Sequence, residues 1–376
     1  MPAESADPVT FPESAMILRG AIGEALGEDD RAAVARGAEA LADMGGGLSL
    51  ASRARIAPFL TPERAAAFAK RFDENVEPVM RGTLEAEVPA EHRIVEGLAW
   101  DAATRRLFAG TVVDGHLLVR EGRVWRRVAL DGPVGGLFGM AIDEQRRLLW
   151  LTSGAAQQVA NPARAFRGLI AVDLDRLAVA RRVPLPEGDT GSPGDLTLAR
   201  DGTVYVSNGE TGAIHVCAPG CARLSDLVPG GRLRNPQGLV LTKDGRRLYI
   251  ADYGYGLAVY DLPARRLSRL VARKPMMLDG IDGLIGYRGD LIAVQNGTNP
   301  RRIIRLALSG DGYSVRSLAV LGRADPDWGE PTLGVVAGRH LLFVADGQWE
   351  RYAARGGAID REPPRPTPVR ALRLAD

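Results

Sequence analysis

Three carboxylates and one amide recur at the same point of a repeated pattern in this 376-residue chain: Glu96, Asp195, Gln237 and Asp282. Each lies beside a Gly that accompanies a short apolar run. If the fold brings these positions together, the carboxylates repel one another and some of their pKa values rise. A hard divalent cation relieves that repulsion, and oxygen ligands suit calcium first, with magnesium or manganese as alternatives. The four histidines fall outside the pattern, which disfavours zinc.

A second set of polar residues ends the next apolar run in four of the repeats. Its members are Asn208, Asp252, Asn296 and Asp346. Two interpretations stay open for this set. Its side chains contact a substrate beside the first set, or they form Asx turns that satisfy the backbone of loops.

The element that must position both sets is a pair of short apolar strands joined by a turn with Asp, Gly or Arg. Six copies of this pair occur, and their inner strands are expected to start at Glu96, Met140, Asp195, Gln237, Asp282 and Thr332. Their spacing of roughly 42 to 55 residues is typical of a four-stranded propeller blade. In a blade the innermost strand starts on the face where its neighbour ends. We therefore predict an all-β six-bladed β-propeller whose polar residues surround one mouth of a central channel.

The two ends of the propeller region are expected to pair. Residues 83–88 and 369–374 both alternate like strands, and their pairing in the last blade would remove free sheet edges. Residues 12–77 favour helices, because they are rich in Ala, and Thr61-Pro62 is a helix cap followed by Pro. The predicted domains are a helical N-terminal segment over 1–77 and the propeller over 78–376. The helical segment is expected to cap the propeller or to bind a protein partner.

Cys217 and Cys221 flank a tight turn and are a candidate disulfide. A bridge there would indicate an oxidising compartment, so we expect a periplasmic or secreted protein, with a cytoplasmic one as the alternative. The chain has no run of eighteen apolar residues, so no membrane span is expected. Its 48 basic and 46 acidic residues give no net field to attract nucleic acid.

The pairs Glu96-Gly97 and Asp282-Gly283, together with six blades, resemble the SMP-30/gluconolactonase/LRE-like family, whose relatives include paraoxonases and strictosidine synthases. The resemblance covers about residues 90–376. It implies a divalent metal at the channel mouth, held by a Glu, an Asn and an Asp, that polarises a lactone carbonyl. Glu96 and Asp282 match the Glu and the Asp. Gln237 stands where the family has Asn, and Gly194 replaces the Asn that precedes Asp195 in the family motif.

Segments of the last third, such as Glu330-Pro331-Thr332 and Ala345–Trp349, resemble a bacterial subgroup of this superfamily whose activity is not established. They concentrate polar residues at strand ends on the expected site face. Trp349 is expected either to form a wall of the pocket or to pack beside it.

The leading hypothesis is a metal-dependent hydrolase of a lactone or similar ester. It has Glu96, Gln237 and Asp282 as metal ligands and Asp195 as general base. The residues expected on the substrate side are Asn208, Asp252, Asn296, Glu330, Asp346 and Trp349. The alternative is a non-catalytic propeller that binds a partner through its channel face or its N-terminal helices; a strictosidine-synthase-like condensation is a third option. The sequence contains no Gly-x-Ser-x-Gly, phosphate-loop or His-Glu-x-x-His motif, and no nucleotide cofactor is implied.

Overall fold

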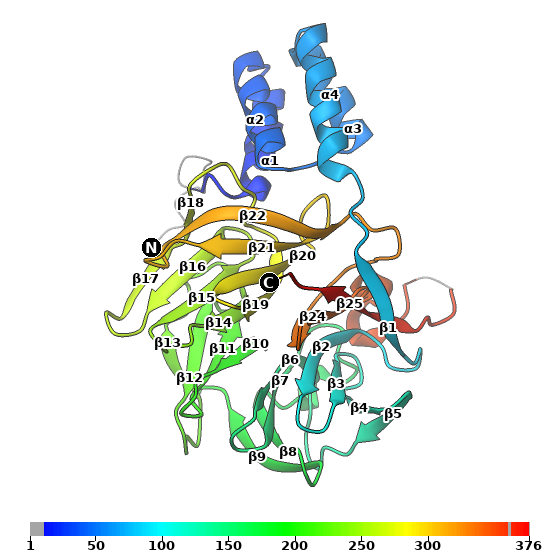
Figure 1. Ribbon diagram of the computed structural model, residues 1–376, viewed down its shortest axis with the longest axis vertical. Coiled ribbons are helices and arrows are strands. Elements are labelled where there is room, and N and C mark those ends of the chain that lie inside the picture. Colours follow the sequence, from blue (N-terminus) through cyan, green and yellow to red (C-terminus); the bar gives the residue numbers. More distant parts are fainter. Residues whose placement is uncertain (1–10, 360–361, 376) are drawn as a thin grey trace.

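Figure 1 shows the computed structural model, which describes residues 11–359 and 362–375. Six sheets surround a central channel, and a small group of helices stands on one side of them. The predicted six-bladed propeller with a helical N-terminal segment is confirmed.

Each blade runs from an inner strand at the channel to an outer strand at the rim. The strands of the first three blades are β2 (Val95–Asp101), β3 (Arg106–Thr111), β4 (Leu117–Glu121) and β5 (Val124–Val128); β6 (Gly136–Asp143), β7 (Leu148–Gly154), β8 (Gly168–Asp173) and β9 (Ala178–Pro184); and β10 (Pro193–Leu198), β11 (Val204–Asn208), β12 (Ala213–Cys217) and β13 (Ser225–Val228). Blades 4 and 5 are β14 (Pro236–Leu241), β15 (Arg247–Asp252), β16 (Gly256–Asp261) and β17 (Arg266–Arg269); and β19 (Ile281–Tyr287), β20 (Asp290–Gln295), β21 (Arg302–Leu308), β22 (Ser314–Arg323) and the short parallel β18 (Val271–Ala272). Blade 6 is β23 (Gly334–Ala337), β24 (His340–Val344), β25 (Thr367–Arg373) and β1 (Gly82–Val88).

The sixth blade closes the ring with strands from both ends of the chain. β1 forms its outer edge and pairs antiparallel with β25, from Gly82 opposite Leu372 to Val88 opposite Thr367. The expected pairing of residues 83–88 with the C-terminal strand is therefore confirmed. Inner strand β23 contacts both β19 and β2, so the circle of blades is continuous.

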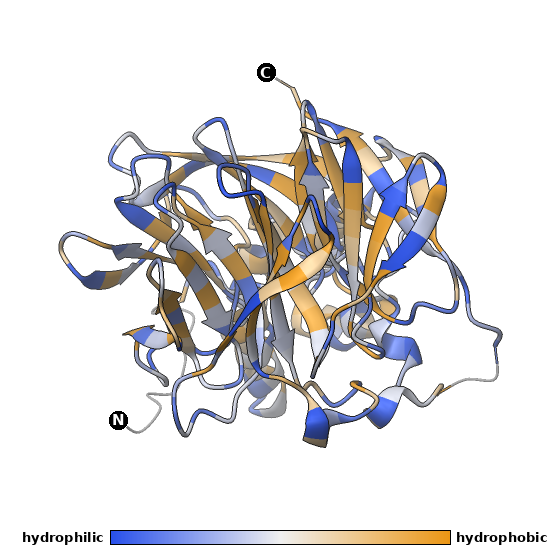
Figure 2. Ribbon diagram, turned by 90° about the horizontal axis from the view of Figure 1, so that it is seen from below, coloured by the Kyte–Doolittle hydropathy of each residue, from blue (hydrophilic) through white to orange (hydrophobic). Residues whose placement is uncertain are grey.

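Hydrophobic clusters fill the spaces between neighbouring blades. Between blades 4 and 5, for example, Tyr249 and Val259 pack against Leu284 and Ile304. Both faces of a blade are thus covered, which explains why its middle strands are almost continuously apolar. In Figure 2 the strands carry most of the hydrophobic residues and the connecting turns most of the hydrophilic ones.

Four helices precede the propeller. They are α1 (Ala15–Gly27), α2 (Arg31–Asp43), α3 (Leu50–Ile56) and α4 (Pro62–Val76), and a single 3₁₀ turn at Ala57–Phe59 follows α3 directly. Further single 3₁₀ turns lie in the propeller at Pro162–Arg164, Trp349–Arg351 and Ala354–Gly356. Each of the four helices begins at a Ser, Asp or Thr whose side chain accepts a backbone N–H of the first turn. The helices share a small core that includes Met277 of the propeller. No helix among the described residues is long and apolar enough to span a membrane.

Cys217 and Cys221 form a disulfide across the turn that follows β12. Their Cα atoms are 5.5 Å apart. The bridge joins the end of a strand to the loop that leads to outer strand β13, so it belongs to the frame of blade 3.

Candidate functional site

A cavity of about 340 Å³ opens at one mouth of the channel. Its described lining residues are Glu96, Phe138, Ala156, Ser192, Pro193, Gly194, Gly209, Glu210, Asn235, Gln237, Tyr253, Asp282, Asn296, Glu330 and Trp349. Every blade contributes to it. The structure thus brings Glu96, Gln237 and Asp282 into one space with Asn296, Glu330 and Trp349.

A bulge in the inner strands turns these side chains toward the channel. The register between inner and second strand slips between Val95 and Leu98 in blade 1, and a similar slip recurs in blades 2 to 5. Glu96 lies within the slip of β2, Gln237 within that of β14 and Asp282 within that of β19. A β-bulge re-aims a side chain, and here it repeats around the ring.

The Gly after Glu96 and the Gly after Gln237 are required by the close approach of the next inner strand. A Cβ on Gly97 would lie 1.9 Å from the carbonyl oxygen of Phe138. A Cβ on Gly238 would lie 2.4 Å from the backbone nitrogen of Leu284. The Glu-Gly and Gln-Gly pairs in the sequence therefore combine a channel-facing side chain with a close contact between blades.

The same bulge corrects two expected ring positions. In blade 2 the slip contains Phe138 and Gly139, so Phe138 lines the cavity where Met140 was expected. In blade 3 Gly194 takes the lining position, and Asp195 follows it at the place that Gly occupies in other blades. Asp195 consequently lies one residue deeper, where its Oδ1 accepts the N–H of Leu196 at 2.8 Å.

The carboxylate of Glu96 is buried at the base of the cavity. Its Oε2 accepts a hydrogen bond from Nε1 of Trp349 at 2.7 Å. Its other carboxylate oxygen has no hydrogen-bond donor among the described residues. Burial, followed by the nearby charge of Asp282, raises the pKa of Glu96 well above its usual range.

Asp282 is held by a short chain of hydrogen bonds. Nδ2 of Asn296 donates to Oδ2 of Asp282 at 2.7 Å, and the hydroxyl of Tyr253 donates to Oδ1 of Asn296 at 2.9 Å. Burial raises the pKa of Asp282 to about 7, and the charge of Glu330 also raises it. Burial likewise raises the pKa of Asp195 to about 7. Carboxyls that titrate near neutrality are typical of functional sites.

Gln237 lines the cavity, and a neighbouring side chain holds its amide group. Its Nε2 donates to Oδ1 of Asn235 at 2.7 Å, which fixes the orientation of the amide. The oxygen Oε1 then lies beside Gly194, the lining residue of the neighbouring blade.

The opposite wall is aromatic and acidic. Phe138 and Trp349 stack with ring centroids 6.4 Å apart and planes inclined by 21°. Glu330 lines the cavity beside them, and burial raises the pKa of its carboxyl while the positive charge of Arg301 lowers it. The sequence did not single out Phe138 or Tyr253, although the pair Phe138-Gly139 repeats the spacing of Glu96-Gly97.

Three residues that were expected on the substrate side lie behind the cavity lining. Nδ2 of Asn208 faces Asp189, and both carboxylate oxygens of Asp252 accept backbone N–H groups of the preceding loop. Oδ1 of Asp346 accepts the N–H groups of Glu330 and Gln348. None of Asn208, Asp252 and Asp346 is among the described lining residues. The local bonds from the N–H of Thr211 to Asn208 and from that of Gln348 to Asp346 match the Asx-turn alternative. The bonds of Asp252 instead reach Arg234 and Asn235, in the loop that precedes inner strand β14.

The donor set has the chemistry that a hard divalent cation needs. No group of three or more His, Cys, Asp and Glu side chains in the described part of the chain is arranged to hold a metal ion. Glu96 and Asp282 offer only two carboxylates, so an ion would also need the amide oxygen of Gln237 and water. The donor-free oxygen of Glu96 and the raised pKa of Asp282 fit such a ligand, because a cation relieves the repulsion between the two carboxylates.

No family model matches the chain, and no curated protein matches it. Solved structures do. Regucalcin from Agrobacterium tumefaciens, described as a calcium-binding protein, is 16% identical with a TM-score of 0.53, covering 77% of this chain and 94% of its own. A gluconolactonase from Xanthomonas campestris is 17% identical with a TM-score of 0.51, covering 80% and 98%. The PQQ-bound aldose sugar dehydrogenase from Streptomyces coelicolor is 13% identical with a TM-score of 0.50, covering 79% and 99%. At these identities the likeness shows the fold, and the structural neighbours of this six-bladed propeller include regucalcin and gluconolactonase.

Proposed function

We propose that the protein is a metal-dependent hydrolase of a lactone or similar ester, with calcium as the ion. The observation that carries the proposal is the convergence of Glu96 and Asp282, two carboxyls with raised pKa values, beside the amide oxygen of Gln237 in one open cavity. The structural likeness to a gluconolactonase and to a calcium-binding regucalcin supports the same choice. A cavity of about 340 Å³ suits a small-molecule substrate.

The chain's own residues divide the work between binding and proton transfer. Glu96, Gln237 and Asp282 would hold the ion, and Asn296 orients Asp282 through its amide. The ion, when bound, supplies a Lewis acid and lowers the pKa of bound water. Phe138 and Trp349 exclude water from one wall and offer a flat apolar surface to the ring of the substrate.

Two carboxyls are candidates for the general base. Asp195 has a pKa of about 7 and lies near Asp282, but its Oδ1 accepts the N–H of Leu196. Glu330 has a raised pKa and lines the cavity itself. Each is a carboxylate of the kind that takes a proton from water in general base catalysis.

The ion can be tested without knowledge of the substrate. Protein stripped with EDTA is melted with calcium, magnesium or manganese titrated back. An ion at about a thousand times its dissociation constant adds roughly 4 kcal/mol to the free energy of unfolding. We expect a saturable rise in Tm that Asp282→Asn abolishes and Asp252→Asn, a carboxylate behind the lining, preserves. A wild-type protein whose Tm responds to none of the three ions would exclude the metal-dependent mechanism.

The disulfide is the one observation that bears on the compartment. A bridge such as Cys217–Cys221 persists in oxidising surroundings, so we propose a periplasmic or secreted location. Fractionation of the source cells, with the thiol state of the two cysteines measured in each fraction, tests this proposal.

A further inference from the structure

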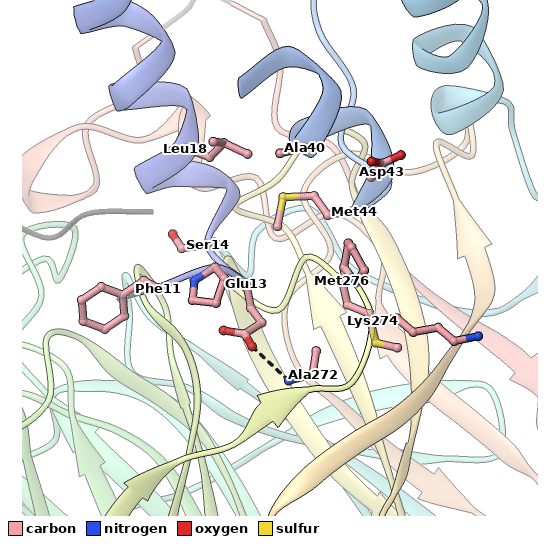
Figure 3. Close-up of a pocket in the computed structure, with 12 residues that line it drawn as sticks. Phe11, Glu13, Ser14, Leu18, Ala40, Asp43, Met44, Ala272, Lys274 and Met276 are labelled. Atoms are coloured by element: carbon pink, nitrogen blue, oxygen red, sulfur yellow. Dashed lines mark hydrogen bonds between the residues drawn. The ribbon is translucent and has the colours of Figure 1, made fainter. Parts of the chain in front are cut away.

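The residues that start the helical segment contact the propeller at a second pocket, which shares no described lining residue with the cavity of the candidate site. Figure 3 shows this junction, with Glu13 and Ser14 next to Ala272, at the end of β18, and the loop after it that contains Met276. The carboxylate of Glu13 accepts the N–H of Ala272 at 3.0 Å, and its carbonyl oxygen accepts the N–H of Leu278 at 2.9 Å. The contact therefore ties the first helix to the chain just ahead of inner strand β19.

Asp279 joins the first helix to this loop. Its Oδ2 accepts the N–H of Met16, in the first turn of α1, at 2.7 Å. The hydroxyl of Ser14, the N-cap of α1, lies 3.2 Å from the same oxygen and 2.9 Å from the carbonyl oxygen of Gly254. A carboxylate at the N-terminus of a helix is stabilised by the helix dipole. Asp279 is only 1% exposed, and its Oδ1 has no hydrogen-bond partner in the described structure.

The backbone of Asp279 and Gly280 forms hydrogen bonds to two neighbouring loops, so three segments meet there: 252–256, 279–283 and 295–299. The N–H of Gly280 donates to the carbonyl oxygen of Tyr253 at 2.6 Å, and the carbonyl oxygen of Gly280 accepts the N–H of Gly297 at 3.2 Å. Nε2 of Gln295 donates to the carbonyl oxygen of Asp279 at 2.7 Å. Gly280 has φ of +63°, and a Cβ there would lie 2.7 Å from the side chain of Thr298, so the crossing is tight.

These three loops carry one side of the cavity. They present Tyr253, Asp282 and Asn296, the residues joined by the hydrogen bonds that orient the carboxylate of Asp282. A second contact joins the helical segment to these loops, because the ring of Phe11 stacks on that of Tyr255 with centroids 4.3 Å apart. The helical segment thus contacts the loops of the site.

We propose that the N-terminal helical segment holds the loops of the site in position, and that Ser14 and Asp279 are positioning residues for Asp282. The first turn of α1 holds the side chain of Asp279 in place. Asp279 in turn holds the backbone at Gly280, where the three loops meet, and this contact positions the hydrogen-bonded side chains of Tyr253, Asn296 and Asp282. The inference rests on the proposed function only for what Asp282 binds; the geometry of the loops is independent of it.

The test compares Ser14→Ala and Asp279→Asn with a matched control, Asp30→Ala, by hydrogen exchange and calorimetric calcium binding on the full chain. Asp30 caps α2 by accepting the N–H of Ala33 at 3.0 Å, so the control removes an equal cap away from the loops. We expect exchange about fivefold faster in residues 252–256, 279–283 and 295–299 of both test variants, but not of the control. We expect calcium affinity about tenfold weaker in the test variants, and restored in Ser14→Thr.

Unchanged exchange in the three loops would overturn the proposal. So would faster exchange with wild-type calcium affinity, because Ser14 and Asp279 would then be anchors of the fold alone. If the wild-type protein binds none of calcium, magnesium and manganese, the hydrolase proposal fails, and the exchange experiment by itself decides whether the helices hold the loops.

Discussion

The indole Nε1 of Trp349 donates a hydrogen bond of 2.7 Å to Oε2 of Glu96. Trp349 lies in a single 3₁₀ turn after β24, and Glu96 lies in the bulge of β2, so the bond spans the junction between the last blade and the first. It occupies one oxygen of the Glu96 carboxylate and leaves the other without a hydrogen-bond donor among the described residues. The ring closure of the propeller and the proposed ion site therefore share a residue pair.

Removing this bond should weaken the ion site. In Trp349→Phe the buried carboxylate of Glu96 loses its one side-chain donor, and a hydrogen bond to a charged group is worth about 1.5–3 kcal/mol. We expect calcium affinity to fall at least about tenfold. Trp125→Phe is the control, since Nε1 of Trp125 donates to the carbonyl oxygen of Glu87 on the outer rim. Equal calcium affinity in the two variants would contradict the assignment of Glu96.

The stability of ion-free protein should fall as the pH rises. Burial raises the pKa values of Asp282 and Asp195 to about 7 in the folded state, against 3.8 when exposed. Groups with a raised folded pKa contribute stability that is complete below the unfolded pKa and is lost as the pH climbs through the folded one. We expect the Tm in EDTA to decline between about pH 4 and pH 7 and to level off above it. Asp282→Asn should flatten the decline, and saturating calcium should reverse it.

Gly97 should not tolerate a side chain. The Cβ of Gly97→Ala would lie 1.9 Å from the carbonyl oxygen of Phe138, so blades 1 and 2 must move apart. Overpacking of this kind costs about 1–3 kcal/mol of unfolding free energy. Gly310→Ala is the control, because its Cβ would meet nothing within 4 Å. Denaturant titration of both variants measures the difference, and equal midpoints would refute the role assigned to Gly97.

Much of this architecture is predictable from the sequence. The repeat of a short apolar run beside a Gly predicts the six inner strands. The alternation of apolar and polar residues over 83–88 and 369–374 predicts that the ring closes through pairing of β1 with β25. The side that Asp195 faces was harder to predict, because the bulge in blade 3 matches that of its neighbours but holds Gly194-Asp195, with the Gly before the polar residue. Asn208 and Asp252 were ambiguous for another reason, since a strand-end carboxylate or amide serves a ligand or a loop equally well in sequence terms. Tyr253 reaches the cavity through a loop, which no periodicity reports.

The two candidate bases should separate by mutation. Glu330 lines the cavity, whereas Asp195 lies one residue deeper with one oxygen occupied by Leu196. If Glu330 takes the proton, Glu330→Gln should lower kcat on a responsive lactone by about 10²–10⁴-fold, with Asp195→Asn closer to wild type. Calcium affinity, measured on both variants, shows whether the ion site survives. A loss of kcat confined to Asp195→Asn would return the general base to the residue that the sequence suggests.

The charge of the cavity should select among substrates. Its described lining includes Glu96, Glu210, Asp282 and Glu330, and it includes no Lys, Arg or His. Even with a divalent ion between Glu96 and Asp282, the other two carboxylates repel an anionic group on the substrate. We expect esters that carry a carboxylate to have kcat/KM at least about tenfold below neutral esters of the same size, and the gap to shrink at high salt because exposed charges are screened. Glu210→Gln, which removes a charge at the exposed rim, should narrow the gap while leaving kcat on the neutral ester unchanged. A wild-type preference for the anionic ester would show that the carboxylates do not face the bound substrate.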